Sequence, residues 1–83
     1  MKVLYFLANW CPQCEKLSEA IANLESKITC PVERVDVDRN EELTQKFKIR
    51  GVPVMLLIVN DVEVRRMEGL PPEHDLISFF NLK

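Results

Sequence analysis

The sequence is short of glycine and aromatic residues and has no strong charge of either sign. Its 83 residues include two glycines, one tryptophan and one histidine, and 11 basic against 13 acidic residues give a formal net charge of −2. Because the basic residues are scattered, the electrostatic footprint of a nucleic-acid-binding protein is missing. No apolar run approaches the roughly 20 residues of a membrane span. We therefore expect neither nucleic acid nor membrane as a partner.

The apolar N-terminal segment also lacks the marks of an export signal. No small-residue cleavage site follows it, and a tryptophan rather than a small residue precedes the first cysteine. We therefore expect a cytoplasmic protein, in a compartment where thiols are kept mostly reduced. The odd count of three cysteines agrees with this, since it argues against a fully paired disulfide framework.

Apolar periodicity and turn residues divide the chain into four strands and three helices. We expect strands at 3–7, 32–37, 54–59 and 62–68, and helices at 12–28, about 41–47 and after residue 72. Pro12 suits the first helical position, which makes Cys11 the N-cap, and Asp38 with Glu41 predicts a capping box for the second helix. An Asn60-Asp61 turn joins the last two strands. This order predicts one α/β domain over residues 1–83, with a mixed four-stranded sheet.

Cys11 and Cys14 lie three residues apart at the start of the first predicted helix. Free backbone N–H groups and the helix dipole stabilise a thiolate at such a position. Cys14 shares the apolar stripe of Leu17 and Ile21 and should be buried, whereas Cys11 at the cap should be exposed. This asymmetry suits thiol–disulfide exchange, in which Cys11 attacks a disulfide and Cys14 then displaces the product thiol.

A metal site on this pair would need two more ligands, and only Cys30 and His74 are available. A first helix that runs to residue 28 puts Cys30 roughly 24 Å from the pair, at 1.5 Å per residue. We therefore interpret Cys30 as a buried structural thiol and His74 as an exposed residue near a helix start, and expect no metal within one subunit. A metal site shared between two subunits, or a non-catalytic binding module, stays open.

Three stretches together resemble the thioredoxin family: NWCPQC after the first strand, DVDRN followed by KFKIRGVPV, and EGL before the last helix. The resemblance covers nearly the whole chain, without the extra N-terminal strand and helix of full-length thioredoxins. It implies the thioredoxin fold, β-α-β-α-β-β-α, and a redox-active disulfide between Cys11 and Cys14 with no bound cofactor. It also implies a cis peptide bond at Val52–Pro53, facing that disulfide.

The activity implied by the resemblance is reduction of protein disulfides by a dithiol electron donor. Its partners would be disulfide-containing protein substrates and an electron donor, either a thioredoxin-reductase-type enzyme or glutathione. An extended substrate segment would dock on a rim formed by Trp10, Pro12, Val52, Pro53, Gly69 and Leu70. A monomer is the default expectation.

Two features depart from the thioredoxin pattern. Tyr5 stands where thioredoxins carry a buried aspartate, with Arg34 as the charged partner that usually accompanies it. We expect a packed core tyrosine, so that the proton of Cys14 moves through water or another group. The Cys-Pro-x-Cys order is closer to glutaredoxins, so glutathione-coupled activity is the main alternative. The GLPP stretch that follows Glu68, where the glutathione-binding motif would fall, weakens that alternative.

Overall fold

Four strands form one mixed sheet in the computed structural model, which describes residues 1–81. The strands are β1 (Lys2–Leu7), β2 (Val32–Asp36), β3 (Val54–Val59) and β4 (Val62–Glu68), in the spatial order β2-β1-β3-β4. Strand β1 runs parallel to β2 and antiparallel to β3, and β3 and β4 form a hairpin. The mixed four-stranded sheet expected from the sequence is thereby confirmed, with β4 at an edge.

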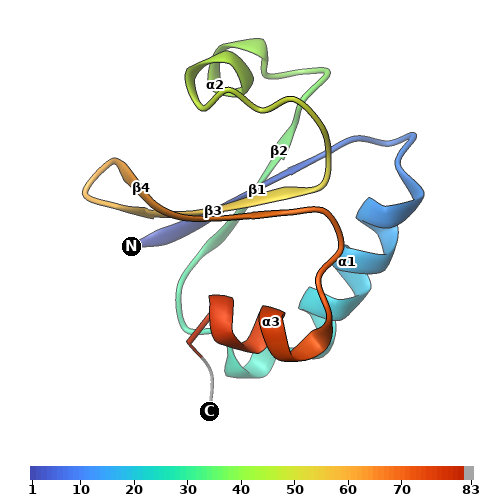
Figure 1. The fold of residues 1–83 in the computed structure, drawn as a ribbon, viewed down its shortest axis with the longest axis vertical. Coiled ribbons are helices and arrows are strands. Elements are labelled where there is room, and N and C mark those ends of the chain that lie inside the picture. Colours follow the sequence, from blue (N-terminus) through green and yellow to red (C-terminus); the bar gives the residue numbers. More distant parts are fainter. Residues whose placement is uncertain (82–83) are drawn as a thin grey trace.

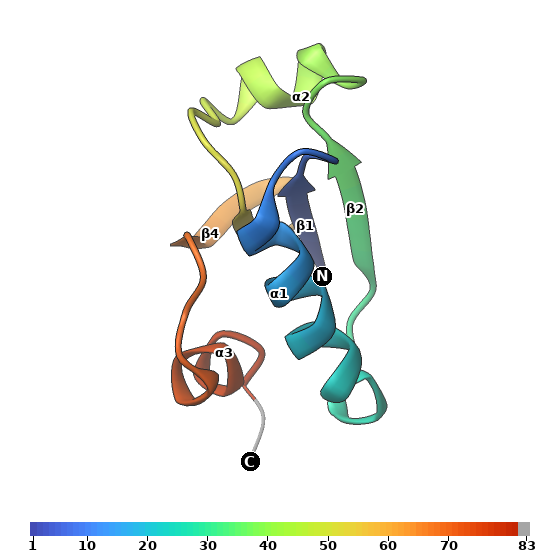
Figure 2. The ribbon, with the colours of Figure 1, turned by 90° about the vertical axis from the view of Figure 1, so that its right-hand side faces the viewer.

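Helices cover both faces of this sheet. They are α1 (Pro12–Asn23), α2 (Glu41–Lys46) and α3 (Glu73–Phe79), with a short 3₁₀ turn, η1 (Glu25–Lys27), after α1. Helices α1 and α3 lie on one side of the sheet and α2 on the other (Figures 1 and 2). The sheet is therefore the middle layer of three.

Strand β1 shows why the first apolar run is nearly continuous. Successive side chains of a strand point to opposite faces. Val3 and Tyr5 belong to the core cluster that includes α1 and α3, while Leu4 and Phe6 belong to the cluster against which α2 packs. All four side chains are at most 3% exposed. Both faces of β1 are thus covered, as its composition predicts.

The first two helices differ from the sequence prediction at one end each. Helix α1 ends at Asn23 rather than residue 28, because the Leu24 N–H bonds to the Ile21 carbonyl three residues back, at 3.0 Å, and the chain tightens into η1. Helix α2 is capped by Asn40, whose Oδ1 accepts the Leu43 N–H at 3.2 Å. The capping box predicted from Asp38 is therefore wrong.

The β3–β4 turn has the chemistry that a tight hairpin requires. Asn60 and Asp61 both take positive φ angles, 52° and 65°. Two positive φ angles are typical of a type I′ turn, whose twist matches that of the flanking strands. The turn predicted at Asn60-Asp61 is confirmed.

Across residues 1–81, no helix has the length and apolar character needed to cross a bilayer.

Candidate active site

The two cysteines of the Cys-x-x-Cys motif lie where β1 leads into α1. Cys11 is the N-cap, in an extended conformation, and Pro12 occupies the first turn and is exposed. The Sγ atom of Cys11 accepts the backbone N–H of Cys14 at 3.1 Å. This bond directs a backbone dipole at the sulfur that would carry negative charge as a thiolate. Both thiols are free.

The burial of Cys14 follows the sequence prediction, whereas that of Cys11 does not. Cys14 is 2% exposed, on the same face of α1 as Leu17 and Ile21. Cys11 was expected to be exposed, yet only 6% of its surface is accessible. That expectation is wrong, because segments far away in the sequence cover the helix cap.

Those covering segments follow β2 and precede β3. Val37 and Val52 pack against the small cluster of Ala8, Cys11 and Cys14. The Cys11 Sγ faces the Val52 carbonyl oxygen at 3.8 Å, within reach of a thiol hydrogen bond. The nucleophile candidate thus lies in a shallow, mostly apolar setting, with polar groups only at its sulfur.

Burial raises the pKa of the Cys14 thiol above that of an ordinary cysteine. Desolvation raises the pKa of Cys14 to about 11, and the neighbouring Cys11 thiol adds to this rise. At neutral pH the Cys14 thiol is therefore protonated. A protonated, buried thiol is suited to a second step, after an initial attack by another sulfur.

The loop before β3 and the chain after β4 meet beside Cys11. The Val52–Pro53 peptide bond is cis, as the resemblance implies. Gly69 donates its N–H to the Pro53 carbonyl at 2.8 Å and takes a φ of +82°, a value that glycine adopts without strain. Leu70, which follows, is 40% exposed. The structure therefore brings Gly69 to Pro53, the neighbour of the Val52 residue that contacts Cys11.

Trp10 is exposed over 68% of its surface, but one hydrogen bond orients it. Its Nε1–H donates to Asp38 Oδ2 at 2.9 Å. Asp38 was assigned to a helix cap from the sequence, and its contact with Trp10 was missed. Because β1 and β2 are parallel, their carboxyl ends share one edge of the sheet, and this relationship could have placed the two residues together.

A groove of about 210 Å³ lies beside Trp10. Its lining comes from the loop between β1 and α1, from the residue after β2, from α2 and from the loop before β3: Trp10, Val37, Thr44, Ile49, Arg50, Gly51 and Val52. Most of these residues were not predicted as site residues, since only the folded chain brings them beside the cysteines. The groove offers an apolar surface that begins at Val52, the residue that contacts the Cys11 thiol.

Tyr5 occupies the space beneath Cys14 as an uncharged group. It is fully buried, and its hydroxyl donates to the Cys14 carbonyl at 2.7 Å and lies 2.9 Å from Ser18 Oγ. Burial raises the pKa of the Tyr5 phenol, which keeps it neutral. Arg34 pairs in register with Tyr5 and lines a hollow of about 320 Å³ with Cys14, Glu15 and Ser18. The expected core tyrosine is confirmed, and Cys14 itself is among the residues that line this hollow.

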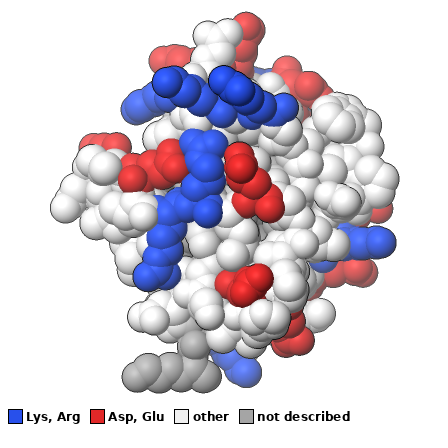
Figure 3. Space-filling model, viewed as in Figure 1, with Lys and Arg blue, Asp and Glu red and all other residues white. Residues whose placement is uncertain are grey.

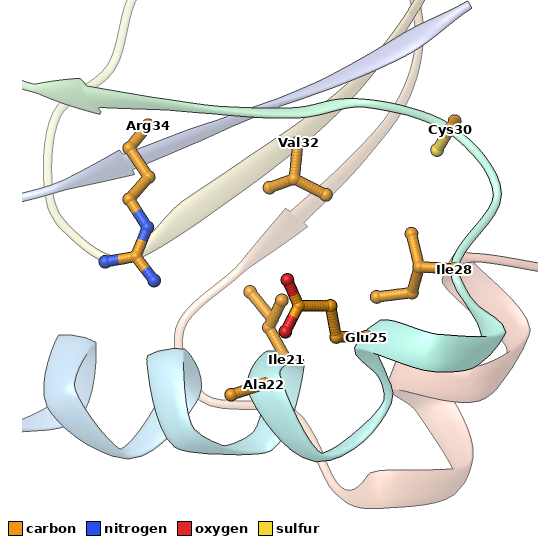
Figure 4. Close-up of a pocket in the computed structure, with 7 residues that line it drawn as sticks. All are labelled: Ile21, Ala22, Glu25, Ile28, Cys30, Val32 and Arg34. Carbon is orange, nitrogen blue, oxygen red and sulfur yellow. The ribbon is translucent and has the colours of Figure 1, made fainter.

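Cys30 lies at the opposite end of the sheet from the Cys-x-x-Cys pair. It precedes β2 at its amino end, whereas Cys11 follows β1 at its carboxyl end, and the two strands are parallel. Cys30 is half-buried rather than buried as predicted, because it lies on the loop that connects η1 to β2. It lines a hollow of about 330 Å³ with Ile21, Ala22, Glu25, Ile28, Val32 and Arg34 (Figure 4).

Cys30 and His74, the further metal ligands that the sequence offers, do not form part of a metal-binding cluster in the part of the chain that the structure describes. Within residues 1–81, no three or more His, Cys, Asp or Glu side chains are grouped in a way that could hold a metal. His74 is exposed, and its Nε2 lies 3.3 Å from Asp75 Oδ1. The candidate site itself contributes two free thiols, those of Cys11 and Cys14.

Comparisons with known proteins identify thioredoxins as relatives of this chain. A family model described as Thioredoxin matches residues 1–81. Thioredoxin-1 of Drosophila yakuba is 34% identical over 78 residues, which cover 92% of this chain and 72% of that protein. Thioredoxin 2 of Plasmodium falciparum is 32% identical and is matched over 50% of its length.

Solved structures agree with the sequence relatives. A thioredoxin-2 of the malaria parasite superposes with a TM-score of 0.87 at 30% identity, covering 96% of this chain and 80% of that one. Fasciola hepatica thioredoxin gives the same TM-score and identity, with 77% of its chain covered. The glutaredoxin alternative is not favoured by these matches. With a Cys-x-x-Cys pair at the cap of α1 and a thioredoxin match across residues 1–81, the chain belongs to the thioredoxin family and is a thiol–disulfide oxidoreductase.

Proposed function

We propose that Cys11 is the nucleophile and Cys14 the resolving thiol in the reduction of protein disulfides. The Cys11 thiolate attacks one sulfur of a substrate disulfide, so that the substrate S–S bond breaks, a Cys11–substrate bond forms and one substrate thiolate leaves and takes up a proton. Cys14 then loses its proton and attacks the Cys11 sulfur. The second substrate thiol is released, a Cys11–Cys14 disulfide forms, and two electrons have passed to the substrate.

The single observation that carries these roles is the contact between the two cysteines. The Cys14 N–H donates to Cys11 Sγ, which stabilises negative charge on Cys11, while burial holds Cys14 in the protonated form. Only one of the two sulfurs is thus prepared to attack first. The disulfide that they form is the proposed redox-active group, and we propose that no other cofactor is bound.

The docking surface proposed for the substrate surrounds Cys11. The backbone at Val52 and Pro53 would pair with an extended substrate segment. Gly69, whose N–H bonds to the Pro53 carbonyl, would lie beside that segment. The exposed Trp10, Pro12 and Leu70 would provide apolar contacts at the rim. Support for this surface comes from the contact of the Cys11 thiol with the Val52 carbonyl.

We propose that electrons reach the Cys11–Cys14 disulfide from a thioredoxin-reductase-type enzyme, with glutathione as the alternative donor, and that the protein works as a monomer in the cytoplasm. The family membership supports the reductase. Oxidised protein mixed with NADPH and such a reductase, or with glutathione, distinguishes the donors by the rate at which free thiols appear. Sedimentation tests whether the protein is a monomer, and cell fractionation tests whether it is cytoplasmic.

The cysteine roles are tested by reduction of insulin disulfides with dithiothreitol as the electron source. Cys11→Ser should lower the rate to that of dithiothreitol alone. Cys30→Ser is the matched control, because it removes a half-buried thiol at the other end of the sheet, and it should keep the full rate. Activity that survives in Cys11→Ser would overturn the proposal.

A further inference from the structure

Outside the redox site, basic side chains gather on one face of the molecule. Figure 3 shows them between the end of α2 and the β3–β4 hairpin, with acidic side chains beside them. The same region contains a hollow of about 620 Å³, here called the basic hollow, lined by Lys46, Phe47, Lys48, Arg50, Glu63, Arg66 and Glu68. Four cations and two carboxylates therefore line it, an excess of positive charge on a chain whose net charge is negative.

Arg66 has its charge satisfied within the fold. Its Nε lies 2.8 Å from Glu63 Oε2, its Nη1 lies 3.7 Å from Glu68, and its Nη2 donates to the Phe47 carbonyl. The hydrogen bond from Arg66 also holds the pKa of Glu63 below its usual range. These pairs use both carboxylates of the hollow, so they leave its other cations without a partner there.

Lys46, Lys48 and Arg50 are those remaining cations. All three are exposed, and none forms an ion pair with any residue from 1 to 81. Lys46 Nζ lies 5.4 Å from the centre of the Phe47 ring, a contact that places it over an aromatic face without neutralising it. Three uncompensated positive charges therefore lie within a few residues of one another.

The basic hollow and the groove beside the redox pair share one lining residue. Arg50 lines both of them, and the groove ends at Val52, whose carbonyl faces the Cys11 sulfur. Three extended residues span roughly 10 Å. A substrate segment that lies along Val52, Gly51 and Arg50 would therefore reach the hollow within a few residues of its reacting cysteine.

We propose that the basic hollow selects protein substrates that carry acidic side chains about three to five residues from the disulfide cysteine. The inference rests on the proposed function, since it assigns a substrate class to that same site. An apolar side chain of the segment would lie against Trp10 and Ile49, and an Asp or Glu would lie near Lys46, Lys48 and Arg50. Opposite charges at the rim of an interface mainly speed association and weaken with salt.

An acidic protein segment fits the basic hollow better than a nucleic acid does. Glu63 and Glu68 lie in the lining and would repel a continuous row of phosphates, whereas isolated carboxylates can lie against the three free cations. The hollow also leads to a thiol pair that acts on disulfides, which a nucleic acid does not contain. A second copy of this chain would bring acidic residues, but it would offer only its own Cys11–Cys14 disulfide, and exchange between two identical pairs gives no net reduction.

The test compares two synthetic peptides that carry the same disulfide and an apolar residue beside it, and that differ only in two positions, Asp-Glu in one and Lys-Lys in the other. We expect wild-type protein to reduce the acidic peptide with a kcat/KM about tenfold higher at 20 mM salt, and the preference to shrink at 300 mM. Lys46→Gln/Lys48→Gln should reduce the preference below about threefold. Lys16→Gln/Lys27→Gln on α1 and η1 changes the net charge equally and should keep it.

The other possible results of this experiment would each contradict one part of the proposal. If wild-type protein reduces neither peptide, the proposed function fails; if it reduces both equally, only the selection of acidic segments is overturned. A preference that persists in Lys46→Gln/Lys48→Gln, or that falls equally in Lys16→Gln/Lys27→Gln, also overturns it. Stronger competition by a single-stranded oligonucleotide than by a disulfide-free acidic peptide would assign the hollow to nucleic acid instead. A dimer in sedimentation that the Lys46→Gln/Lys48→Gln change abolishes would assign it to a second copy.

Discussion

Trp10 and Asp38 are 28 residues apart in the sequence, and a 2.9 Å hydrogen bond from the indole Nε1–H to the carboxylate joins them beside the redox pair. The bond connects the chain that leaves β1 with the chain that leaves β2. A large aromatic side chain that is 68% exposed is thereby held in one orientation before any partner arrives. An ordered aromatic surface loses less conformational entropy when a substrate docks on it.

Removing the acceptor should weaken docking. Asp38→Ala should raise KM for a protein disulfide about two- to fivefold with little change in kcat, since an exposed hydrogen bond contributes about 1 kcal/mol and Trp10 would have to be ordered on binding. Steady-state kinetics measure this. Asp38→Asn retains an acceptor oxygen and is the control, with KM close to wild type. An unchanged KM in Asp38→Ala would mean that packing alone orients Trp10.

Replacing the resolving thiol should stop the reaction at its intermediate. Cys14→Ser has no second sulfur to displace the substrate, so the Cys11–substrate mixed disulfide should accumulate as a stable adduct. Mass spectrometry of the protein after incubation with a disulfide peptide detects the added mass. Cys11→Ser should form no adduct at position 14, because the Cys14 thiol is buried and protonated. Multiple turnover by Cys14→Ser without added thiol would contradict the assigned order.

The raised pKa of Cys14 should appear in the stability of the reduced protein. The unfolded thiol ionises near its ordinary value of 9.0 and the folded one near 11, so the unfolded chain releases its proton first as pH rises. The contribution of Cys14 to the free energy of unfolding is thus constant below pH 9 and falls between pH 9 and 11, by about 3 kcal/mol. Urea unfolding of the reduced protein against Cys14→Ala isolates this loss. Parallel pH curves for the two proteins would contradict it.

The buried hydroxyl of Tyr5 should contribute measurably to stability. Tyr5→Phe removes the bonds to the Cys14 carbonyl and to Ser18 Oγ, and should lower the free energy of unfolding by about 1–2 kcal/mol. Ser18→Ala removes only the second bond and should cost less than Tyr5→Phe. Urea unfolding compares the three proteins. A Tyr5→Phe variant as stable as wild type would show that the two bonds contribute nothing net.

The two glycines offer a matched pair of backbone tests. Gly69→Ala places a side chain at a φ of +82° and should cost about 1–2 kcal/mol of stability, because an L residue is strained there. A Cβ at Gly51 meets nothing within 4 Å and has no such φ, so Gly51→Ala should change stability far less. Thermal unfolding of both variants is sufficient. Equal losses would remove backbone strain as the cause.

Short-range patterns account for what the sequence predicts well. The alternation of Val3 and Tyr5 with Leu4 and Phe6, and the helical spacing of Cys14 with the apolar residues of α1, depend only on residues close in the chain. Residues in such patterns reach their positions by local geometry. The strands, the three helices and the Cys-x-x-Cys site at a helix start were therefore predictable.

Long-range contacts account for what it misses. The cover over Cys11 comes from Val37 and Val52, and the partner of Trp10 comes from the end of β2. Each contact depends on how two separate segments meet at the carboxyl edge of the sheet, which no local spacing encodes. The same reason explains Cys30, whose exposure depends on where η1 ends rather than on its own neighbours in sequence.

The neutral phenol of Tyr5 affects the free energy of unfolding of the domain. A chain of 83 residues buries only about two-thirds of its unfolded surface, so its margin against unfolding is small. A carboxylate in that position would have to be desolvated on folding, and its charge would oppose burial. Tyr5 is fully buried there as a neutral group, and its hydroxyl bonds to the Cys14 carbonyl and to Ser18 Oγ inside the fold. Among residues 1–81, the core beneath the redox pair is thereby free of buried charge, so a domain with a small margin loses none of it to the desolvation of an ion.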